Sequence, residues 1–304
     1  MRVFLITSKL NFTTAGGSVT DLHLKAFGLK KMGHEVIVVT AYSFNNKINS
    51  ALPYQIITEN IVAGNYLSKQ WRLHLLLKKY EKQADVFYID GNNFLYGAAF
   101  YKILGGQTST VLFFNMLLNC WRDPHLNIKT FYFFSKFKRR LRFFLEKYIG
   151  TVLVNKNDIF IYNTPMVENI YRQFGFRRPG FILEDFVDTE EIMQTNHINL
   201  ESIANKQKND GVIKIYCSGR LYSEKGFDLV IKAFFLLDNK NRYQLIIGGD
   251  GPEKIHLQQL TADLCLDNFV LFTGWVNKQK MADFFNQAKI FVFPKWWQEY
   301  GSVI

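Results

Sequence analysis

The sequence predicts an α/β fold with two domains that each contain a parallel sheet. Short β-branched or aromatic runs alternate with amphipathic helical patterns, and the alternation begins again after a polar stretch at residues 187–211. The length of 304 residues suits two domains of about 150 residues each. Apolar residues form 48% of the chain and charged residues 21%, which is a globular composition. We expect the domains to span residues 1–180 and 181–304.

The first half opens with a β-loop-α-β unit. Val3–Thr7 has a strand pattern, and a loop with Gly16 and Gly17 leads to a helical pattern over residues 20–32. The run VIVVT at Val36–Thr40 fits a strand that is buried on both faces of a parallel sheet. Three further strands are expected, at Val86–Ile89, Thr110–Phe114 and Ile159–Tyr162.

The second half repeats the alternation. Four strands are expected, at Val212–Cys217, Gln244–Ile247, Phe269–Thr273 and Ile290–Pro294. Helical patterns lie between them, at Phe227–Leu237, Glu253–Cys265 and Lys278–Asn286. A doubly wound nucleotide-binding sheet usually has about six strands, at roughly 30 residues per unit. We therefore expect the second domain to be incomplete, by about 60 residues after Ile304.

Charge is divided unequally between the halves. Residues 1–180 contain 24 Lys and Arg against 10 Asp and Glu, a net charge of +14, whereas residues 181–304 contain 13 against 16. Such asymmetry indicates that the first half faces a polyanion, either an anionic membrane leaflet or nucleic acid. We favour the membrane, because no nucleic-acid-binding motif is found.

Membrane-spanning and secretion signals are not found in the sequence. The apolar run after Met1 is too short for a signal peptide, and no stretch of about 18 uncharged apolar residues occurs. We expect a cytoplasmic protein, peripheral at the inner face of the membrane. Cys120, Cys217 and Cys265 lack metal-ligand spacing and are expected to be buried thiols.

Three glycine-rich turns follow predicted strands, where open α/β sheets bind ligands. They contain Gly16-Gly17, Ser218-Gly219-Arg220 and the run GDGP at 249–252. Each turn alone is an ordinary turn signal, and single basic residues are mostly solvated. Arg220 and Lys225 together, between a strand and a helix N-terminus, suit a diphosphate leaving group.

Longer runs resemble the retaining glycosyltransferases of family 4. GGSVTDLHLKAFGLKKMGHEVIVVT is similar to the family's opening, and SGRLYSEKGFDLVIKAF to its GR-x4-KG donor motif. Further motifs occur in the family's order and approximate spacing: Phe186-Val187-Asp188, GDGP, the run FTGWV and finally FVFP with WWQEYG. The resemblance runs from residue 1 to the end of the chain.

The resemblance implies a GT-B fold, with two Rossmann-like domains facing across a cleft. It implies transfer of a hexose from a nucleoside diphosphate sugar to a glycan or lipid-linked acceptor, with retention of anomeric configuration and without a metal or other cofactor. Arg220, Lys225 and Glu299 would be catalytic. The donor-binding positions would be Gly16, Gly17, Gly219, Gly249, Gly251, Gly274, Val276 and Gly301.

Two departures from the family's pattern concern catalysis. The first Glu of the family's paired carboxylates falls on Gln298, so either Gln298 replaces it or Glu299 supplies it through a one-residue shift. The second Glu would fall beyond Ile304. Upstream, the family usually has a His-Asp pair after a strand, but this chain has Asn115 at that place. Asn115 could donate a hydrogen bond to the sugar but could not shuttle a proton.

A basic amphipathic helix is expected at residues 131–150. One stripe consists of Phe134, Phe137, Leu141, Phe144, Leu145 and Tyr148, with Lys136, Lys138, Arg139, Arg140, Arg142 and Lys147 around it. This pattern is typical of a helix on an anionic membrane surface. It equally fits a domain helix whose stripe packs on the sheet and whose charges are solvated.

Three other functions compete with sugar transfer. A non-catalytic remnant or sugar-nucleotide-binding module would explain the missing ribose-gripping Glu. A GT-B-like sugar-nucleotide epimerase is less favoured, because its acid and base side chains are not evident. A dinucleotide dehydrogenase is disfavoured, because no GxGxxG run follows the first strand.

Overall fold

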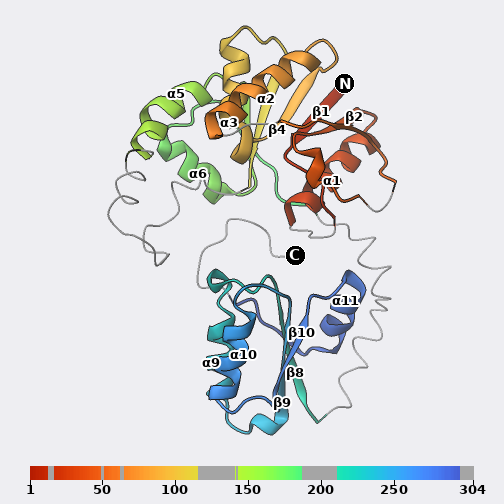
Figure 1. Ribbon diagram of the computed structural model, residues 1–304, viewed down its shortest axis with the longest axis vertical. Coiled ribbons are helices and arrows are strands. Elements are labelled where there is room, and N and C mark those ends of the chain that lie inside the picture. The colour runs from red at the N-terminus through yellow and green to blue at the C-terminus, as the bar shows by residue number, and fades with distance from the viewer. Residues whose placement is uncertain are drawn as a thin grey trace. The chain divides into compact units, whose positions relative to one another are not determined.

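The computed structural model describes residues 1–12, 17–48, 51–61, 65–115, 141, 143–186 and 211–294. These residues form two compact units, one within residues 1–186 and the other within residues 211–294. Both units consist of a parallel sheet with helices on its faces (Figure 1).

The first unit contains a seven-stranded parallel sheet in the order β3-β2-β1-β4-β5-β6-β7. Its strands are β1 (Arg2–Thr7), β2 (Glu35–Thr40), β3 (Gln55–Thr58), β4 (Val86–Asp90), β5 (Ser109–Phe114), β6 (Ile159–Tyr162) and β7 (Gly180–Ile182). The order reverses between β1 and β4, which makes that point the topological switch where such sheets bind ligands.

Helices cover both faces of this sheet. They are α1 (Gly17–Lys31), α2 (Tyr66–Tyr80), α3 (Gly91–Ile103), α5 (Thr151–Val154) and α6 (Pro165–Phe174), with the turns η1 (Ser43–Asn45) and η3 (Glu146–Gly150). Side chains of β1 alternate between the faces: Val3 and Leu5 pack in the core that includes Ala26 of α1, and Phe4 and Ile6 pack under α2 and α3. The η3 turn is π-helical and runs directly into α5.

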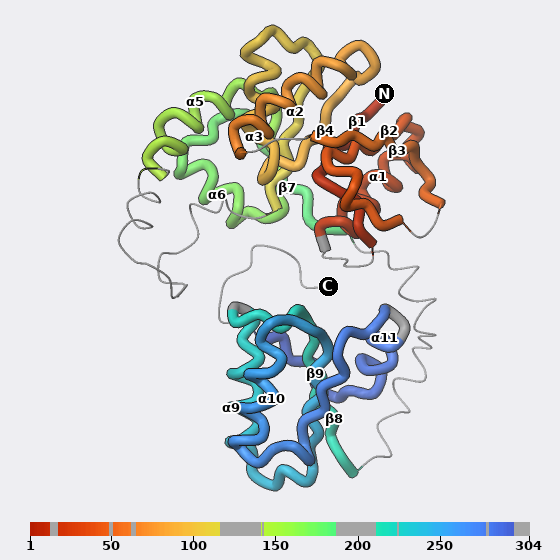
Figure 2. Tube along the Cα trace, viewed as in Figure 1, coloured from red at the N-terminus to blue at the C-terminus, as the bar shows by residue number. Residues whose placement is uncertain are grey.

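The second unit contains a four-stranded parallel sheet in the order β10-β9-β8-β11. Its elements are β8 (Ile213–Ser218), η5 (Ser223–Lys225), α9 (Phe227–Phe235), η6 (Lys240–Arg242), β9 (Tyr243–Gly248), α10 (Lys254–Asp263), β10 (Val270–Gly274), α11 (Lys278–Gln287) and β11 (Ile290–Phe291). Ile215 and Cys217 of β8 face the core with α9 and α10, whereas Tyr216 packs on Phe284 and Phe285 of α11. Figure 2 shows α9 and α10 on one side of the strands β8 and β9 and α11 on the other.

Local sequence explains several element ends. Thr164 caps α6 by accepting a hydrogen bond from the Val167 N–H at 3.2 Å, and Pro165 follows in the first turn. Gly175 ends the same helix with a positive φ. Asn65 and Ser68 form a capping box at the start of α2.

Every strand expected from the sequence is present, with ends shifted by a few residues. Two strands were not predicted from the sequence: β3 and β7, which are short strands at the two edges of the first sheet with little burial. Because β7 ends at Ile182, the first sheet extends past the expected boundary at residue 180. The expected burial of Cys265 is wrong, since this residue is exposed in the turn after α10 with a φ of +55°. Cys217 is buried as expected, and Cys120 lies outside the described residues.

Candidate functional site

The carboxyl ends of three strands in the second unit are joined by backbone hydrogen bonds. The N–H of Gly219, after β8, donates to the carbonyl of Gly248 at 2.9 Å. The N–H of Gly249, after β9, donates to the carbonyl of Gly274 at 2.8 Å. These bonds hold three loops side by side at the edge where open α/β sheets bind ligands.

Gly249 and Gly251 let the loop after β9 touch the loop after β8. A Cβ atom on Gly249 would overlap the carbonyl oxygen of Gly219, and a Cβ on Gly251 would lie 2.5 Å from the carbonyl oxygen of Leu221. Gly249 also has a φ of +134°, which L side chains rarely adopt. The two glycines therefore allow the backbones of the two loops to pack closely. In the sequence alone, the run GDGP looks like an ordinary turn.

Arg220 and Lys225 bring positive charge to this edge. Arg220 is exposed, and its guanidinium lies 5.5 Å from the centre of the Tyr222 ring. Lys225 ends η5, and its Nζ lies 5.9 Å from the ring of Phe293, just beyond β11. Because the strand order reverses between β8 and β11, Lys225 lies at the switch point of the second sheet.

The helix α9 begins directly after Lys225. Gly226 at its N-cap has a φ of +71° and has no side chain with which to cap the helix. The first N–H groups of α9 and the positive end of its dipole therefore face the same edge as the two cations. Asp228 in the first turn is paired with Lys232 at 2.9 Å. Arg220, Lys225 and the first N–H groups of α9 could together hold an anion such as a diphosphate.

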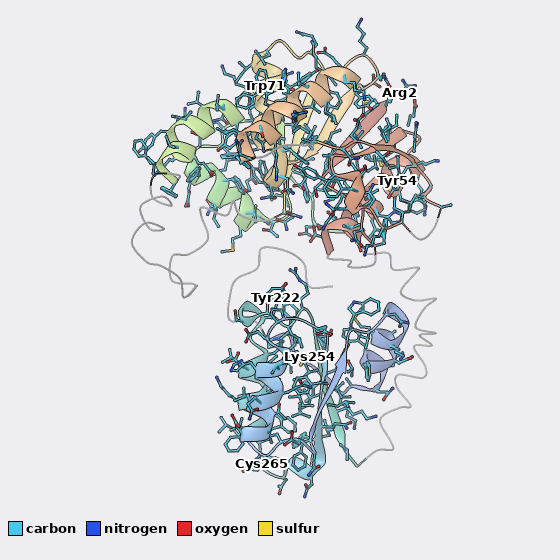
Figure 3. The ribbon with its side chains drawn as sticks, viewed as in Figure 1. Arg2, Tyr54, Trp71, Tyr222, Lys254 and Cys265 are labelled. Atoms are coloured by element: carbon cyan, nitrogen blue, oxygen red, sulfur yellow. The ribbon has the colours of Figure 1, made fainter. Side chains whose placement is uncertain are left out.

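Lys254 is a third cation at this edge, and it was not predicted as a site residue from the sequence. It is the first residue of α10, and its Nζ lies 3.4 Å from a carboxylate oxygen of Asp250. The same Nζ lies near Gly274, because a Cβ atom added to that glycine would be 3.9 Å from it. The signal in the sequence is a basic residue shortly after GDGP. Tyr222 and Lys254 lie toward this end of the unit, and Cys265 lies at the opposite end (Figure 3).

The remaining expected donor residues fall in different parts of the chain. Gly274 ends β10 with a φ of +68°, and Val276 is half-buried two residues later. Gly17 is the first residue of α1. Gly16, Glu299 and Gly301 lie outside the described residues.

An apolar hollow of about 360 Å³ lies elsewhere in the second unit. It is lined by Ile215, Leu229, Val230, Ala233, Phe234, Leu237, Leu245, Val292 and Pro294. These side chains offer a nucleotide no charge and no hydrogen bond. The hollow therefore does not belong to the candidate donor site.

Asn115, at the carboxyl end of β5 in the first unit, is held through its backbone by two other asparagines. Its N–H donates to Oδ1 of Asn92 at 3.3 Å, and its carbonyl accepts a hydrogen bond from Nδ2 of Asn163 at 3.2 Å. Asn92 follows β4 and Asn163 follows β6, so the three strand ends are joined. This arrangement fixes the backbone of Asn115 at the carboxyl edge of the sheet.

A buried ion pair lies at the switch point of the first sheet. Nζ of Lys25 lies 2.6 Å from Oδ2 of Asp21 and 3.4 Å from the centre of the Phe113 ring. The two charged side chains are 4% and 8% exposed. Burial raises the pKa of Asp21 and lowers the pKa of Lys25, although each charge partly opposes the shift of the other. Desolvation therefore outweighs the attraction between the two groups.

The second unit also matches a protein family. Residues 199–304 match the family model of the glycosyl transferases group 1. An uncharacterised glycosyltransferase of Methanocaldococcus jannaschii is 30% identical over 168 residues, which cover 52% of this chain and 40% of that protein. The chain spans about 40% of the length of such curated relatives.

Solved structures share the fold at low sequence identity. WaaG, a glycosyltransferase involved in lipopolysaccharide biosynthesis, has a TM-score of 0.67 and 15% identity, with 98% of this chain and 76% of that chain covered. HepE of Anabaena, solved in complex with UDP, has a TM-score of 0.61 and 14% identity, with coverages of 98% and 75%. The chain thus has the α/β architecture of the GT-B glycosyltransferases, and its second unit matches the group 1 family of these enzymes.

Proposed function

We propose that this chain transfers a hexose from a nucleoside diphosphate sugar to a hydroxyl group of a glycan or lipid-linked acceptor, with retention of anomeric configuration. The observation that carries the proposal is the placement of Arg220 and Lys225 at the carboxyl edge of the second sheet, beside the N-terminus of α9. The match to the group 1 family includes both residues. The UDP complex of the similarly folded HepE supports a nucleotide donor.

The two cations would act on the leaving group. As the bond between the anomeric carbon and the phosphate oxygen breaks, negative charge develops on the diphosphate, and Arg220 and Lys225 would stabilise it together with the N–H groups of α9. The acceptor oxygen forms the new bond on the same face, and its proton passes to the departing phosphate. No protein nucleophile is needed for this sequence of bond changes.

The protein's cations would also take the place of a metal ion. A guanidinium offers a fork of donors and an ammonium a compact charge, and both can neutralise a diphosphate directly. We therefore propose that the transfer needs no metal. On the acceptor side, the amide of Asn115 would hydrogen-bond the sugar.

Donor turnover tests this function without knowledge of the acceptor. The protein is incubated with UDP-glucose, GDP-mannose and ADP-glucose in the presence of EDTA, with water as a surrogate acceptor, and the released diphosphate is measured. Proton NMR of the fresh hexose, before mutarotation, should show the α-anomer from these α-linked donors. Release of the β-anomer would contradict retention.

A matched pair of variants separates the site from general damage. Arg220→Ala/Lys225→Ala should slow diphosphate release at least tenfold, whereas Lys240→Ala/Arg242→Ala removes the same charge from η6 at the opposite end of the sheet and should leave it unchanged. Binding of a nucleotide without any turnover would instead favour a sugar-nucleotide-binding module.

A further inference from the structure

Carboxylates gather around one tyrosine at the carboxyl edge of the first sheet. Tyr88 lies near the end of β4, and its partner across the switch point is Leu5 of β1. Burial raises the pKa of the Tyr88 hydroxyl, and the charges of Asp21, Asp90 and Asp185 raise it further. These carboxylates come from α1, the end of β4 and the segment after β7, so three parts of the chain meet beside one side chain.

Aromatic and ionic contacts join the same group of side chains. The rings of Tyr88 and Phe113 are stacked, with their centres 5.9 Å apart. The Nζ of Lys25 lies 3.4 Å from the centre of the Phe113 ring and 2.6 Å from Oδ2 of Asp21. The cluster therefore lies between α1 and the ends of β4 and β5, and Asn115 directly follows β5.

Two oxygen atoms of this cluster are buried without a hydrogen-bond partner. Among the residues that the structure describes, neither Oδ1 of Asp21 nor the hydroxyl of Tyr88 is hydrogen-bonded. The Asp21 side chain is only 8% exposed. An ion pair that served the fold alone would be expected to use both carboxylate oxygens, and phenylalanine would fill the place of Tyr88 without an unpaired hydroxyl. The two oxygens therefore point to a ligand that donates hydrogen bonds.

The cluster carries more negative charge than its own lysine balances. The carboxylates of Asp21, Asp90 and Asp185 stand against the ammonium group of Lys25. Burial raises the pKa of the Asp21 and Asp90 carboxyl groups, as expected where a buried charge is incompletely compensated. Residues 1–180 as a whole have a net charge of +14. An acidic place within a basic unit disfavours a phosphate and favours a cation.

An organic ammonium group fits these features best. It has three donors and no acceptor, which suits Oδ1 of Asp21 and the oxygen of the Tyr88 hydroxyl. It would also balance the excess negative charge, which a sugar hydroxyl would not. In the part of the chain that the structure describes, no three His, Cys, Asp or Glu side chains are placed to hold a metal ion. An organic cation is therefore a better match to these side chains than a metal ion.

We propose that this edge recognises an acceptor sugar that carries an ammonium group, with the side chains of Asp21, Tyr88 and Asp185 around that group. The inference rests on the proposed function, because it names the chemical class of the sugar that would receive the hexose. Asn115, at the end of the neighbouring strand, would contact the same sugar.

Calorimetric titration with three sugars tests this recognition without a donor. Glucosamine, N-acetylglucosamine and glucose differ at one carbon, which carries an ammonium, a neutral amide or a hydroxyl group. At about pH 6 the amine of glucosamine is protonated. We expect the 304-residue protein to bind glucosamine at least tenfold more tightly than either neutral sugar. Asp185→Asn should lose most of this preference, because it removes a charge beside the ammonium group.

Tyr88→Phe separates recognition from folding. The substitution removes a hydroxyl that has no partner within the described residues, so the variant should be at least as stable as the parent in urea. Its affinity for glucosamine should fall at least fivefold. Tyr162→Phe is the matched control and should bind glucosamine as the parent does. Its hydroxyl is also buried and unpaired in the described structure, but it lies on the opposite face of the sheet, beside Arg172.

Two results would overturn the inference. Glucosamine could bind no more tightly than glucose, or not at all, or Tyr88→Phe could keep the parent's full affinity. Diphosphate release from the donor is a separate measurement on the same protein. Release without a preference for glucosamine would overturn this inference and leave the proposed function intact. A preference for glucosamine without any release would support the recognition of an ammonium group and contradict the proposed transfer.

Discussion

At the carboxyl edge of the first sheet, the polar groups that could contact a ligand belong to side chains. At the carboxyl edge of the second sheet, backbone groups of the loops form a larger part of the polar surface. The first edge has the Asp21–Lys25 pair and the three asparagines around Asn115. The second has loops brought together by glycines, with cations at their margin. Side-chain amides and carboxylates suit the hydroxyl groups of an acceptor, and backbone N–H groups with cations suit a diphosphate.

The largest effect is expected at the buried pair of the first edge. Lys25→Met would leave Asp21 as an unpaired buried charge, and we expect it to lower the free energy of unfolding by about 3–5 kcal/mol. Asp21→Leu/Lys25→Met removes both charges and should return to within about 1 kcal/mol of the parent. Urea unfolding followed by circular dichroism measures both. A single variant as stable as the double variant would show that the pair is not buried as described.

At the carboxyl edge of the second sheet, one added methyl group should disrupt the close approach of the loops after β8 and β9. Gly249→Ala places a Cβ against the carbonyl of Gly219 and strains a φ of +134°, so we expect a loss of about 2–4 kcal/mol in the unfolding free energy. Gly33→Ala is the matched control, because φ is also positive there but no atom lies within 4 Å of the added Cβ. It should cost only about 1 kcal/mol. Equal losses at the two positions would mean that the loops after β8 and β9 do not need their close approach.

Acid titration contrasts the carboxyl edge of the first sheet with its amino edge. At the amino edge, Glu81 is paired with Lys78 and accepts hydrogen bonds from the Gln107 N–H and the Tyr101 hydroxyl, which lowers its pKa to about 2. A lowered pKa stabilises the fold above the unfolded-state pKa of about 4.5, and this stability is lost as the pH falls toward 2. Glu81→Gln should therefore cost about 1–2 kcal/mol at pH 7. Its effect should shrink between pH 5 and pH 2.

Asp21 should show the opposite dependence on pH. Burial raises its pKa above 3.8, so its contribution to stability is largest below that value and is lost as the pH rises through the folded-state pKa. The cost of Asp21→Asn relative to the parent should consequently not shrink as the pH falls from 5 to 2. If the loss of unfolding free energy changed with pH in the same way for Glu81→Gln and Asp21→Asn, the contrast between the two edges would be contradicted.

The alternation of strand and helix patterns was sufficient to predict both sheets. Hydrophobic periodicity located every interior strand, because buried parallel strands are continuous apolar runs. The edge strands β3 and β7 lack that signal, since their side chains are largely exposed. The helix expected at residues 131–150 shows a further limit. Periodicity identified its apolar stripe, but only the structure shows that the described members of the stripe, Leu141, Phe144, Leu145 and Tyr148, are 43 to 58% exposed. Among the described helices none is long and apolar enough to cross a bilayer.

Contacts between distant residues could not be predicted from one sequence. Asn92 and Asn163 lie 23 and 48 residues from Asn115, and nothing in their local sequence indicates that they hold it. Asp21 and Lys25 have the spacing of an ordinary surface pair on a helix, and only the packing of α1 on the sheet buries them. The motif around Arg220 and Lys225 was visible because its residues are local.

The most direct test of the donor site is a calorimetric titration with UDP and UMP. If Arg220 and Lys225 bind the diphosphate, the parent should bind UDP at least tenfold more tightly than UMP, a difference of about 1.4 kcal/mol. Arg220→Ala/Lys225→Ala should lose that difference, and Lys240→Ala/Arg242→Ala should keep it. A double variant at Arg220 and Lys225 that still prefers UDP as strongly as the parent would contradict the central claim.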